Sequence, residues 1–226
     1  MKAKRSTQLA TVCLLTALAI AVPVMRTDAA VIYGFDYVIT GTMPFGSPPW
    51  ATLTIENYAT NQVKFTLQAN LQDSNEFITK LLLNVDPFVS VSLVPGSVSG
   101  GSTVNSVTVS ENGLNNAGGE WFDLKIEFPT SGNRLTDTEW LSWRLQGTGL
   151  TENHFLAKSA KKQGQSFLPG THYALLHVQG VGQNSGKLGA AVIPEPATLL
   201  LFGMGLAAPL LKRRRNGNRN LPEWAP

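Results

Sequence analysis

Apolar and polar residues alternate over several short stretches in the middle of the chain, which is the pattern of a strand with one buried face. In residues 62–70 every second position is apolar: Val63, Phe65, Leu67 and Ala69. Residues 50–57 alternate in the same way, and a link of four residues, 58–61, joins the two stretches. We expect the two stretches to form an antiparallel hairpin.

Further strands are expected along the chain, each bounded by residues that are typical of turns. They cover residues 31–40, 77–85, 89–94, 103–109, 121–128, 139–146 and 173–178, with a short additional strand at 155–156. No long window of residues 30–193 has the 3.6-residue apolar period of a helix. The pattern therefore predicts an all-β fold over residues 30–180, an antiparallel β-sandwich with a jelly-roll-like arrangement.

Three stretches of this part are expected to lie outside the strands. We predict a polar loop at residues 112–119 and irregular structure at residues 158–170. Residues 181–192 are rich in Gly, Ser and Asn, which is typical of a flexible linker. This composition predicts a spacer between the folded domain and the C-terminal end of the chain.

The C-terminal end combines a proline motif, an apolar run and a block of cations. Pro194 and Pro196 hold Glu195 in an extended segment, and an uncharged run at 197–211 follows. Four cations then close the run: Lys212, Arg213, Arg214 and Arg215. An apolar run before cations is the pattern of a membrane segment whose basic end stays in the cytoplasm. Because a span usually needs about 20 residues, we expect a short transmembrane helix.

The order of proline motif, short apolar helix and arginine cluster resembles the PEP-CTERM sorting signal, here over residues 193–215. The resemblance implies an exported protein of a Gram-negative bacterium that is processed by an exosortase, a membrane transpeptidase. It assigns processing to Pro194, Glu195 and Pro196, and membrane topology to the basic cluster. It also implies transient anchoring in the inner membrane, followed by transfer to the cell surface or extracellular matrix. Residues 216–226 are expected to form a cytoplasmic extension, although such signals usually stop at the basic residues.

The N-terminal end is typical of a secretory signal peptide. Lys2, Lys4 and Arg5 precede an apolar run at residues 9–24, and small residues around Ala29 suit cleavage. Residues 1–29 are therefore predicted to engage the Sec translocon and to be removed by signal peptidase. The only cysteine of the chain is Cys13, inside this segment, so the mature protein has no disulfide and no thiolate chemistry.

The charge of the chain is distributed unevenly. The whole chain has a formal net charge of +3, but many of the cations lie in the two ends. Residues 30–193 contain nine Lys and Arg against twelve Asp and Glu, a net charge of −3. A nucleic-acid-binding domain is expected to carry a basic stripe. We therefore expect no nucleic acid as a partner.

The histidines and serines do not have the spacing of a metal site or a catalytic motif. His172 and His177 are five residues apart, so on one continuous strand they point to opposite faces and cannot bind the same metal. Together with His154 they are interpreted as isolated surface or edge histidines. No serine lies in a Gly-x-Ser-x-Gly elbow.

The acidic residues also favour a structural interpretation. Asp123 and Glu127 are expected on the solvent face of their strand, with Lys125 between them. The oxygen-rich stretches 73–76 and 112–116 would suit Ca²⁺, but turn formation explains them without a metal. We therefore expect no catalytic residue, no cofactor and no metal site.

Two tryptophans are the candidate binding residues. Trp121 and Trp140 fall on the faces opposite the apolar rows of their strands. If they are exposed, they would stack on sugar rings. The alternative interpretation is that both faces of the sheet are partly buried at these positions.

Three functions remain open at this point. The leading hypothesis is a non-enzymatic surface or extracellular-matrix protein associated with exopolysaccharide and biofilm. It depends on the family resemblance, which extends diffusely over residues 50–193 to a domain often carried ahead of such signals, and on the lack of a catalytic motif. The alternatives are a carbohydrate-binding module that uses Trp121 or Trp140, and a polysaccharide-active enzyme, which would need two carboxylates across a cleft.

Overall fold

The computed structural model of this protein describes residues 30–117, 119–163 and 166–193. These residues form one short 3₁₀ helix, η1 (Glu152–Phe155), and thirteen strands. The strands are β1 (Val31–Gly41), β2 (Ala51–Ala59), β3 (Gln62–Ala69), β4 (Phe77–Leu83), β5 (Ser92–Leu93), β6 (Ser99–Gly100), β7 (Ser106–Ala117), β8 (Glu120–Glu127), β9 (Trp140–Gln146), β10 (Ala160–Gln163), β11 (Ser166–Pro169), β12 (Ala174–Val181) and β13 (Asn184–Ile193). The predicted all-β class is confirmed.

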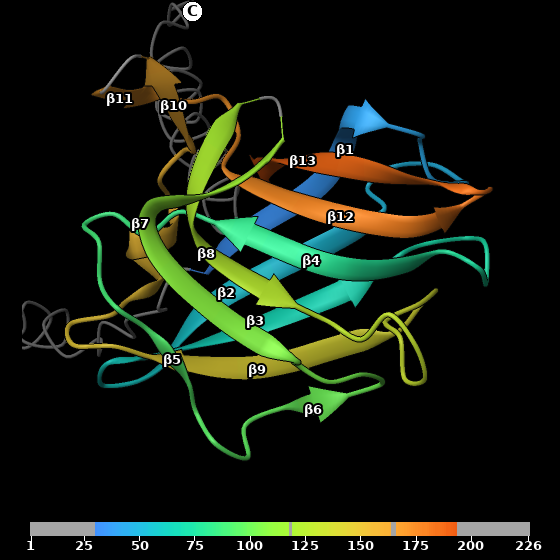
Figure 1. The fold of residues 1–226 in the computed structure, drawn as a ribbon. Helices are drawn as coiled ribbons and strands as arrows, with labels where there is room; N and C mark the ends of the chain where they lie inside the picture. The colour runs from blue at the N-terminus through green and yellow to red at the C-terminus, as the bar shows by residue number, and fades with distance from the viewer. Residues whose placement is uncertain (1–29, 118, 164–165, 194–226) are drawn as a thin grey trace, which may run out of the picture.

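The strands belong to one continuous antiparallel sheet. Its order is β11-β10-β8-β4-β12-β13-β1-β2-β3-β9-β5, with β7 paired to β8 and β6 paired to β9. Strand β1 joins the two halves, because it pairs with β13 and with β2. The sheet folds over, so that β2 and β3 lie behind β4 and β8, while β9 runs below them (Figure 1).

One hydrophobic core fills the space between the two halves. Its largest members come from both halves and include Tyr33, Phe65 and Trp143, which have no exposed surface. Phe65 and Trp143 stack with ring centroids 5.3 Å apart, and Phe65 meets the ring of Phe155 edge-on. The Tyr33 hydroxyl donates a hydrogen bond to the Phe155 carbonyl oxygen, so η1 is fixed against the core.

The hairpin expected from the alternating pattern is confirmed. Strands β2 and β3 pair antiparallel, with Leu53 opposite Leu67 and Ile55 opposite Phe65. All four of these side chains are fully buried, and the polar residues between them are half-buried on the other face. Burial of alternate side chains fixes the register of this pair, because a slip of one residue would expose the apolar row.

The predicted linker at residues 181–192 is wrong. After a short turn, Asn184–Ile193 forms β13, which lies inside the sheet between β12 and β1. At two of its glycines, neighbouring groups approach the backbone too closely for a side chain to fit. A Cβ at Gly186 would collide with the Thr42 carbonyl oxygen, and one at Gly189 would collide with the ring of Tyr37. The sequence is therefore glycine-rich because other groups cross this strand closely.

Four smaller predictions are also corrected. Strand β7 continues to Ala117 through the predicted polar loop, because it pairs with β8 past Asn112, where the backbone has a positive φ. Part of the predicted irregular segment forms β10 and β11, which pair with each other. Residues 155–156 contribute to the end of η1 and not to a strand. The strand expected at 89–94 is limited to Ser92–Leu93.

The two ends of the described domain lie side by side. Ile32, near the start of β1, pairs with Ile193, the last residue of β13. The predicted signal peptide and the C-terminal segment from Pro194 onward, with its expected helix, lie outside the described residues. Within those residues, no helix is long and apolar enough to cross a membrane. The chain thus enters and leaves the sheet at one end, on neighbouring strands.

Candidate functional site

A buried carboxylate at the start of β8 organises the most extensive polar network in the described residues. Glu120 has an exposed fraction of 2%. The Ser159 hydroxyl donates a hydrogen bond to its Oε2. The Thr171 hydroxyl and backbone N–H both donate to its Oε1, at 2.6 Å and 3.2 Å. The carboxylate thus connects β8 to two segments that lie 39 and 51 residues further along the chain.

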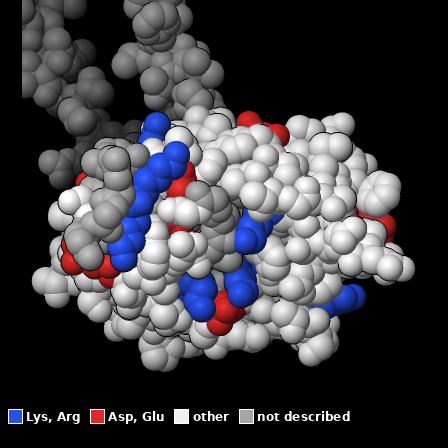
Figure 2. All heavy atoms as spheres, turned by 45° about the horizontal axis from the view of Figure 1, so that its top comes forward, with Lys and Arg blue, Asp and Glu red and all other residues white. Residues whose placement is uncertain are grey.

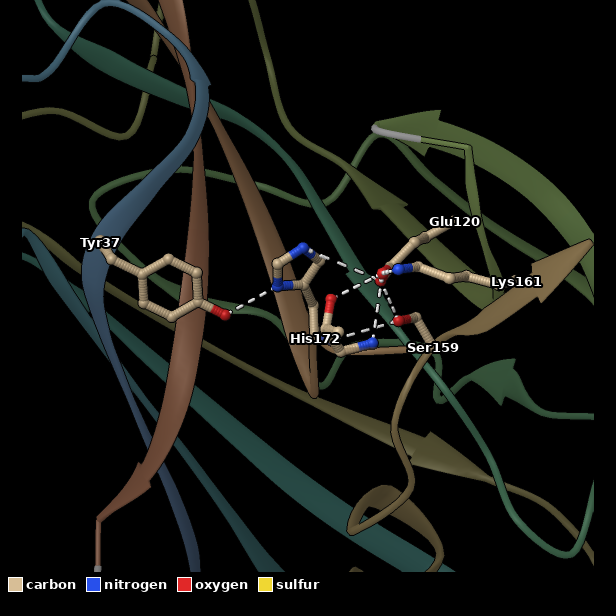
Figure 3. A network of polar contacts seen from close by, with 6 residues as sticks. Tyr37, Glu120, Ser159, Lys161 and His172 are labelled. Atoms are coloured by element: carbon tan, nitrogen blue, oxygen red, sulfur yellow. Dashed lines mark hydrogen bonds and ion pairs between the residues drawn. The ribbon is translucent and has the colours of Figure 1, made fainter. Parts of the chain in front are cut away.

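Backbone pairing brings these partners to Glu120. The Ser159 N–H donates to the His172 carbonyl oxygen at 2.7 Å. The Gly170 N–H donates to the Ser159 carbonyl oxygen at 2.5 Å. The Ser159 hydroxyl also accepts from the His172 N–H at 3.2 Å. The segment before β10 and the segment before β12 are therefore tied to each other next to the carboxylate (Figure 3).

Two cationic or titratable side chains lie at the rim of the network. Lys161 Nζ is 3.7 Å from Glu120 Oε1, and its side chain is half-exposed. His172 Nε2 is 3.8 Å from Glu120 Oε2, which is longer than a hydrogen bond. On its other side, His172 Nδ1 lies 2.8 Å from the Tyr37 hydroxyl. Figure 3 shows the resulting line from Tyr37 through His172 to Glu120.

The electrostatics favour an ionised Glu120 beside a neutral histidine. Burial alone would raise the pKa of Glu120, but the hydrogen bonds from Ser159 and Thr171, with His172 nearby, outweigh it and lower the pKa. Burial lowers the pKa of His172, and Lys161 lowers it further, while Glu120 opposes both. Burial, together with Asp36 and Glu120, raises the pKa of Tyr37. At neutral pH the His172–Glu120 contact is thus not an ion pair.

The geometry of the network is that of a structural clasp. A Ser-His-acid triad requires the serine hydroxyl to face the imidazole, so that the ring can take its proton. Here the Ser159 hydroxyl donates to the carboxylate, and Ser159 is 1% exposed. A ligand would have to displace surrounding side chains to reach it. Within the described residues, no group of three or more His, Cys, Asp or Glu is arranged to hold a metal ion.

The two tryptophans have different surroundings and lie on strands that are not paired. Trp140, at the start of β9, is 46% exposed. Trp121, in β8, is half-buried, and Lys162 Nζ lies 5.5 Å from the centroid of its ring. The structure therefore presents Trp140 to solvent, while Lys162 covers part of Trp121.

The predicted solvent position of Asp123 is wrong. The residue is 6% exposed, and its carboxylate accepts hydrogen bonds from the N–H groups of Val85 at 3.0 Å and Asn112 at 2.5 Å. Glu127 does lie at the surface, next to Lys125. Asp123 is buried because the segments around Val85 and Asn112 cover this end of β8. Alternation alone cannot show that both faces are covered.

The histidines, interpreted as isolated, each have a partner. His154 Nδ1 accepts from the Thr151 N–H at 3.3 Å, at the start of η1. His177 Nδ1 lies 2.7 Å from the Thr79 hydroxyl. In the first oxygen-rich stretch, Asp73 Oδ1 accepts from the N–H and the side-chain amide of Asn75, as expected for a turn.

Sequence reasoning did not find the central residues of the network. Glu120 is a single acid at the start of a strand. Its partner Ser159 lies in the segment expected to be irregular, and Thr171 lies just after that segment. No local pattern connects them, because the contact depends on tertiary pairing. The prediction nearest to the site is the start of a strand at residue 121, next to Glu120.

Comparison with known proteins gives one result, at the C-terminal end. Residues 192–215 match the family model of the PEP-CTERM protein-sorting motif, as carried by exosortase substrates. The match begins at the second-last residue of β13 and includes Pro194, Glu195, Pro196 and the basic cluster up to Arg215. No curated protein and no solved structure matches the chain.

Proposed function

We propose that this protein is exported as an exosortase substrate and then acts outside the cell as a non-enzymatic surface or matrix protein, associated with exopolysaccharide and biofilm. Its N-terminal segment would pass through the Sec translocon and be cut by signal peptidase. The inner membrane would hold the C-terminal segment until the exosortase processes it, in a Gram-negative cell. The sandwich of residues 30–193, which we still expect to be jelly-roll-like, would be the working part.

The observation that supports this proposal most strongly is the sorting motif at residues 192–215. The motif overlaps the sheet by only two residues, since β13 ends at Ile193. Removal of the tail at the Pro-Glu-Pro segment would therefore leave every described strand in place. The Glu120 clasp also favours a non-enzymatic role, because its serine donates to the carboxylate and is buried.

Intact-mass spectrometry of the protein recovered from its host tests the sorting step. We expect the wild-type mass to correspond to a chain that begins near residue 30 and ends near residues 194–196. A strain that lacks the exosortase should retain the tail, as should the variant Glu195→Ala. The variant Glu223→Ala, outside the matched residues, is the control and should be processed normally. Retention of the tail in every strain would contradict the proposal and indicate a permanent anchor.

A carbohydrate-binding module remains the second candidate, and the exposure of Trp140 favours it. An indole ring that is 46% exposed at the start of a strand is a suitable platform for a sugar ring. Trp121 supports this candidate less, because it is half-buried under Lys162. Loss of glycan binding in Trp140→Ala would support this alternative.

A further inference from the structure

A row of polar side chains crosses the outer face of the sheet half that contains β13, β12, β4 and β8. In the strand register, Lys187 lies opposite His177, His177 lies opposite Lys80, and Lys80 lies opposite Glu127. Paired residues of neighbouring strands project to the same face. Their chain neighbours belong to the core: Leu188, Leu176, Leu81 and Ile126. Because successive side chains point to opposite faces, the row points outward.

Lysines outnumber acids in this row. We use the name lysine row for the set Lys187, His177, Lys80, Glu127 and Lys125. Lys125 Nζ and Lys80 Nζ lie 3.2 Å and 3.6 Å from the same oxygen, Glu127 Oε1. The Ser106 hydroxyl donates to Glu127 Oε2 at 2.9 Å. This hydrogen bond and the two lysines lower the pKa of Glu127. The row thus contains three lysines and one carboxylate, which Lys80 and Lys125 share.

His177 lies between Lys187 and Lys80 on the paired strands. Burial lowers the pKa of His177, and Lys80 and Lys187 lower it further. The groups that act on it from the neighbouring strands are these two lysines and the Thr79 hydroxyl. A ring between two lysines resists protonation because the local potential is positive.

The charge of the domain is strongly segregated. Residues 30–193 carry a net charge of −3, yet five of their nine cations lie on strands of one half of the sheet: Lys80, Lys125, Lys161, Lys162 and Lys187. A sixth, Lys158, lies shortly before β10. In Figure 2, Lys and Arg atoms surround a small patch of Asp and Glu atoms low in the view, and more Lys and Arg atoms lie at the left. On the other half, Lys64 pairs with Glu56 at 2.8 Å.

We propose that the lysine row binds an acidic polysaccharide, through carboxylate groups of successive uronate-type sugars. Lys187 and Lys80 are two strands apart, which corresponds to about 10 Å, so an extended chain laid across the strands would meet a cation at both positions. Lysine suits such a ligand because its flexible, hydrated ammonium group adapts to single carboxylates. The assignment of a ligand outside the cell rests on the proposed export.

An anionic membrane surface is a less suitable partner. Peripheral membrane binding usually combines cations with apolar side chains that enter the interface. Among the described residues, β4, β8 and β12 have no exposed large apolar side chain, and on β13 the exposed ones are Val192 and Ile193, at the end of the strand. The face that carries the row therefore has charge without an apolar anchor on these central strands.

Calorimetric titration of the processed protein with oligogalacturonate tests the proposal, with maltoheptaose as the uncharged probe. We expect oligogalacturonate to bind, with an affinity that falls as salt rises, and maltoheptaose not to bind. The double variant Lys80→Gln/Lys187→Gln should weaken binding about tenfold. The matched control Lys64→Gln changes a lysine on the opposite half and should leave binding unchanged. Thermal unfolding of each variant verifies that the fold is intact.

A second readout is local to the row. A bound carboxylate would raise the pKa of His177, as followed by NMR of its imidazole protons, with His154 as the internal reference. Equal binding of both oligosaccharides, an equal effect of Lys64→Gln, or loss of binding in Trp140→Ala but not in the double variant would each overturn the proposal. Binding to vesicles with anionic lipid but not to oligogalacturonate would also overturn it. Because export is scored separately by intact mass, its failure would be distinguishable from failure of this site.

Discussion

Two buried glutamates, at the starts of the paired antiparallel strands β4 and β8, show how differently one side chain can be accommodated. Glu120 precedes Trp121 in β8, and Glu76 stands directly before β4, so they lie at opposite ends of this pair. Both are almost inaccessible, at 2% and 0% exposure. Yet the pKa of Glu120 is lowered and the pKa of Glu76 is raised.

The difference comes from the number of hydrogen-bond donors. Glu120 receives three hydrogen bonds, and two cationic or titratable groups lie at its rim. Glu76 receives one, from the Phe45 N–H at 2.9 Å, and its Oε2 has no partner among the described residues. Burial therefore dominates at Glu76, with Asp73 adding repulsion. The two equally buried glutamates thus have pKa values shifted in opposite directions. Several hydrogen-bond donors stabilise the charged form of Glu120, whereas Glu76 has only one.

The largest effect is expected when the carboxylate of Glu120 is removed. Glu120→Ala leaves the Ser159 and Thr171 donors without their acceptor and a void in their place. We expect the free energy of unfolding to fall by about 3 kcal/mol. Urea unfolding followed by tryptophan fluorescence measures it. A change below about 0.5 kcal/mol would show that the clasp contributes no net stability.

The pH dependence of stability sharpens the contrast. His172 and His177 have folded pKa values below their ordinary value of 6.5. Their contribution to the free energy of unfolding is therefore present above pH 6.5 and is lost as pH falls through the folded pKa values. The contribution of Glu120 is present above its ordinary value of 4.5 and is lost as pH falls through its lowered pKa. Glu76 acts in the reverse sense: its contribution is full below 4.5 and is lost as pH rises through its raised pKa.

We therefore expect the wild-type domain to lose stability as pH falls from 7 to 4, with Glu76 alone of these four groups opposing the trend. Urea unfolding at several pH values measures this slope. The slope between pH 5 and 4 should be shallower in Glu120→Ala than in wild type, whereas the loss near pH 6 should remain, because the histidines are still present. An unchanged slope below pH 5 would contradict the lowered pKa assigned to Glu120.

The sequence predicted the parts of this fold in which a single face is buried. The β2–β3 hairpin was readable because its polar residues stay on an open face while Leu53, Ile55 and Phe65 enter the core. The start of β8 was misjudged because segments far along the chain cover its second face. Asp123 is therefore buried where alternation predicts solvent, and Glu120, just before the predicted strand, is buried as well.

Strand β13 was missed for a different physical reason. Its glycines look like a flexible linker, but Gly189 is crossed by the ring of Tyr37, and Gly186 faces the Thr42 carbonyl oxygen. Composition alone cannot distinguish a glycine selected for flexibility from one selected for close packing. The candidate site depended on the same long-range contacts, so its clasp could not be predicted, whereas the sorting motif is a local pattern and could be.

Replacement of Glu76 is expected to have the smallest effect on the free energy of unfolding, and one of opposite sign to that at Glu120. Glu76→Gln keeps a carbonyl oxygen for the Phe45 N–H and removes a buried charge that the surroundings disfavour. We expect the free energy of unfolding at pH 7 to rise by roughly 0.5 kcal/mol, because an incompletely bonded neutral amide costs less to bury than a carboxylate. Urea unfolding of Glu76→Gln beside Glu120→Gln makes the comparison direct, since the same substitution should destabilise at residue 120. A loss of stability in both variants would mean that Glu76 is held as firmly as Glu120, and that the missing partner of its Oε2 has no energetic consequence.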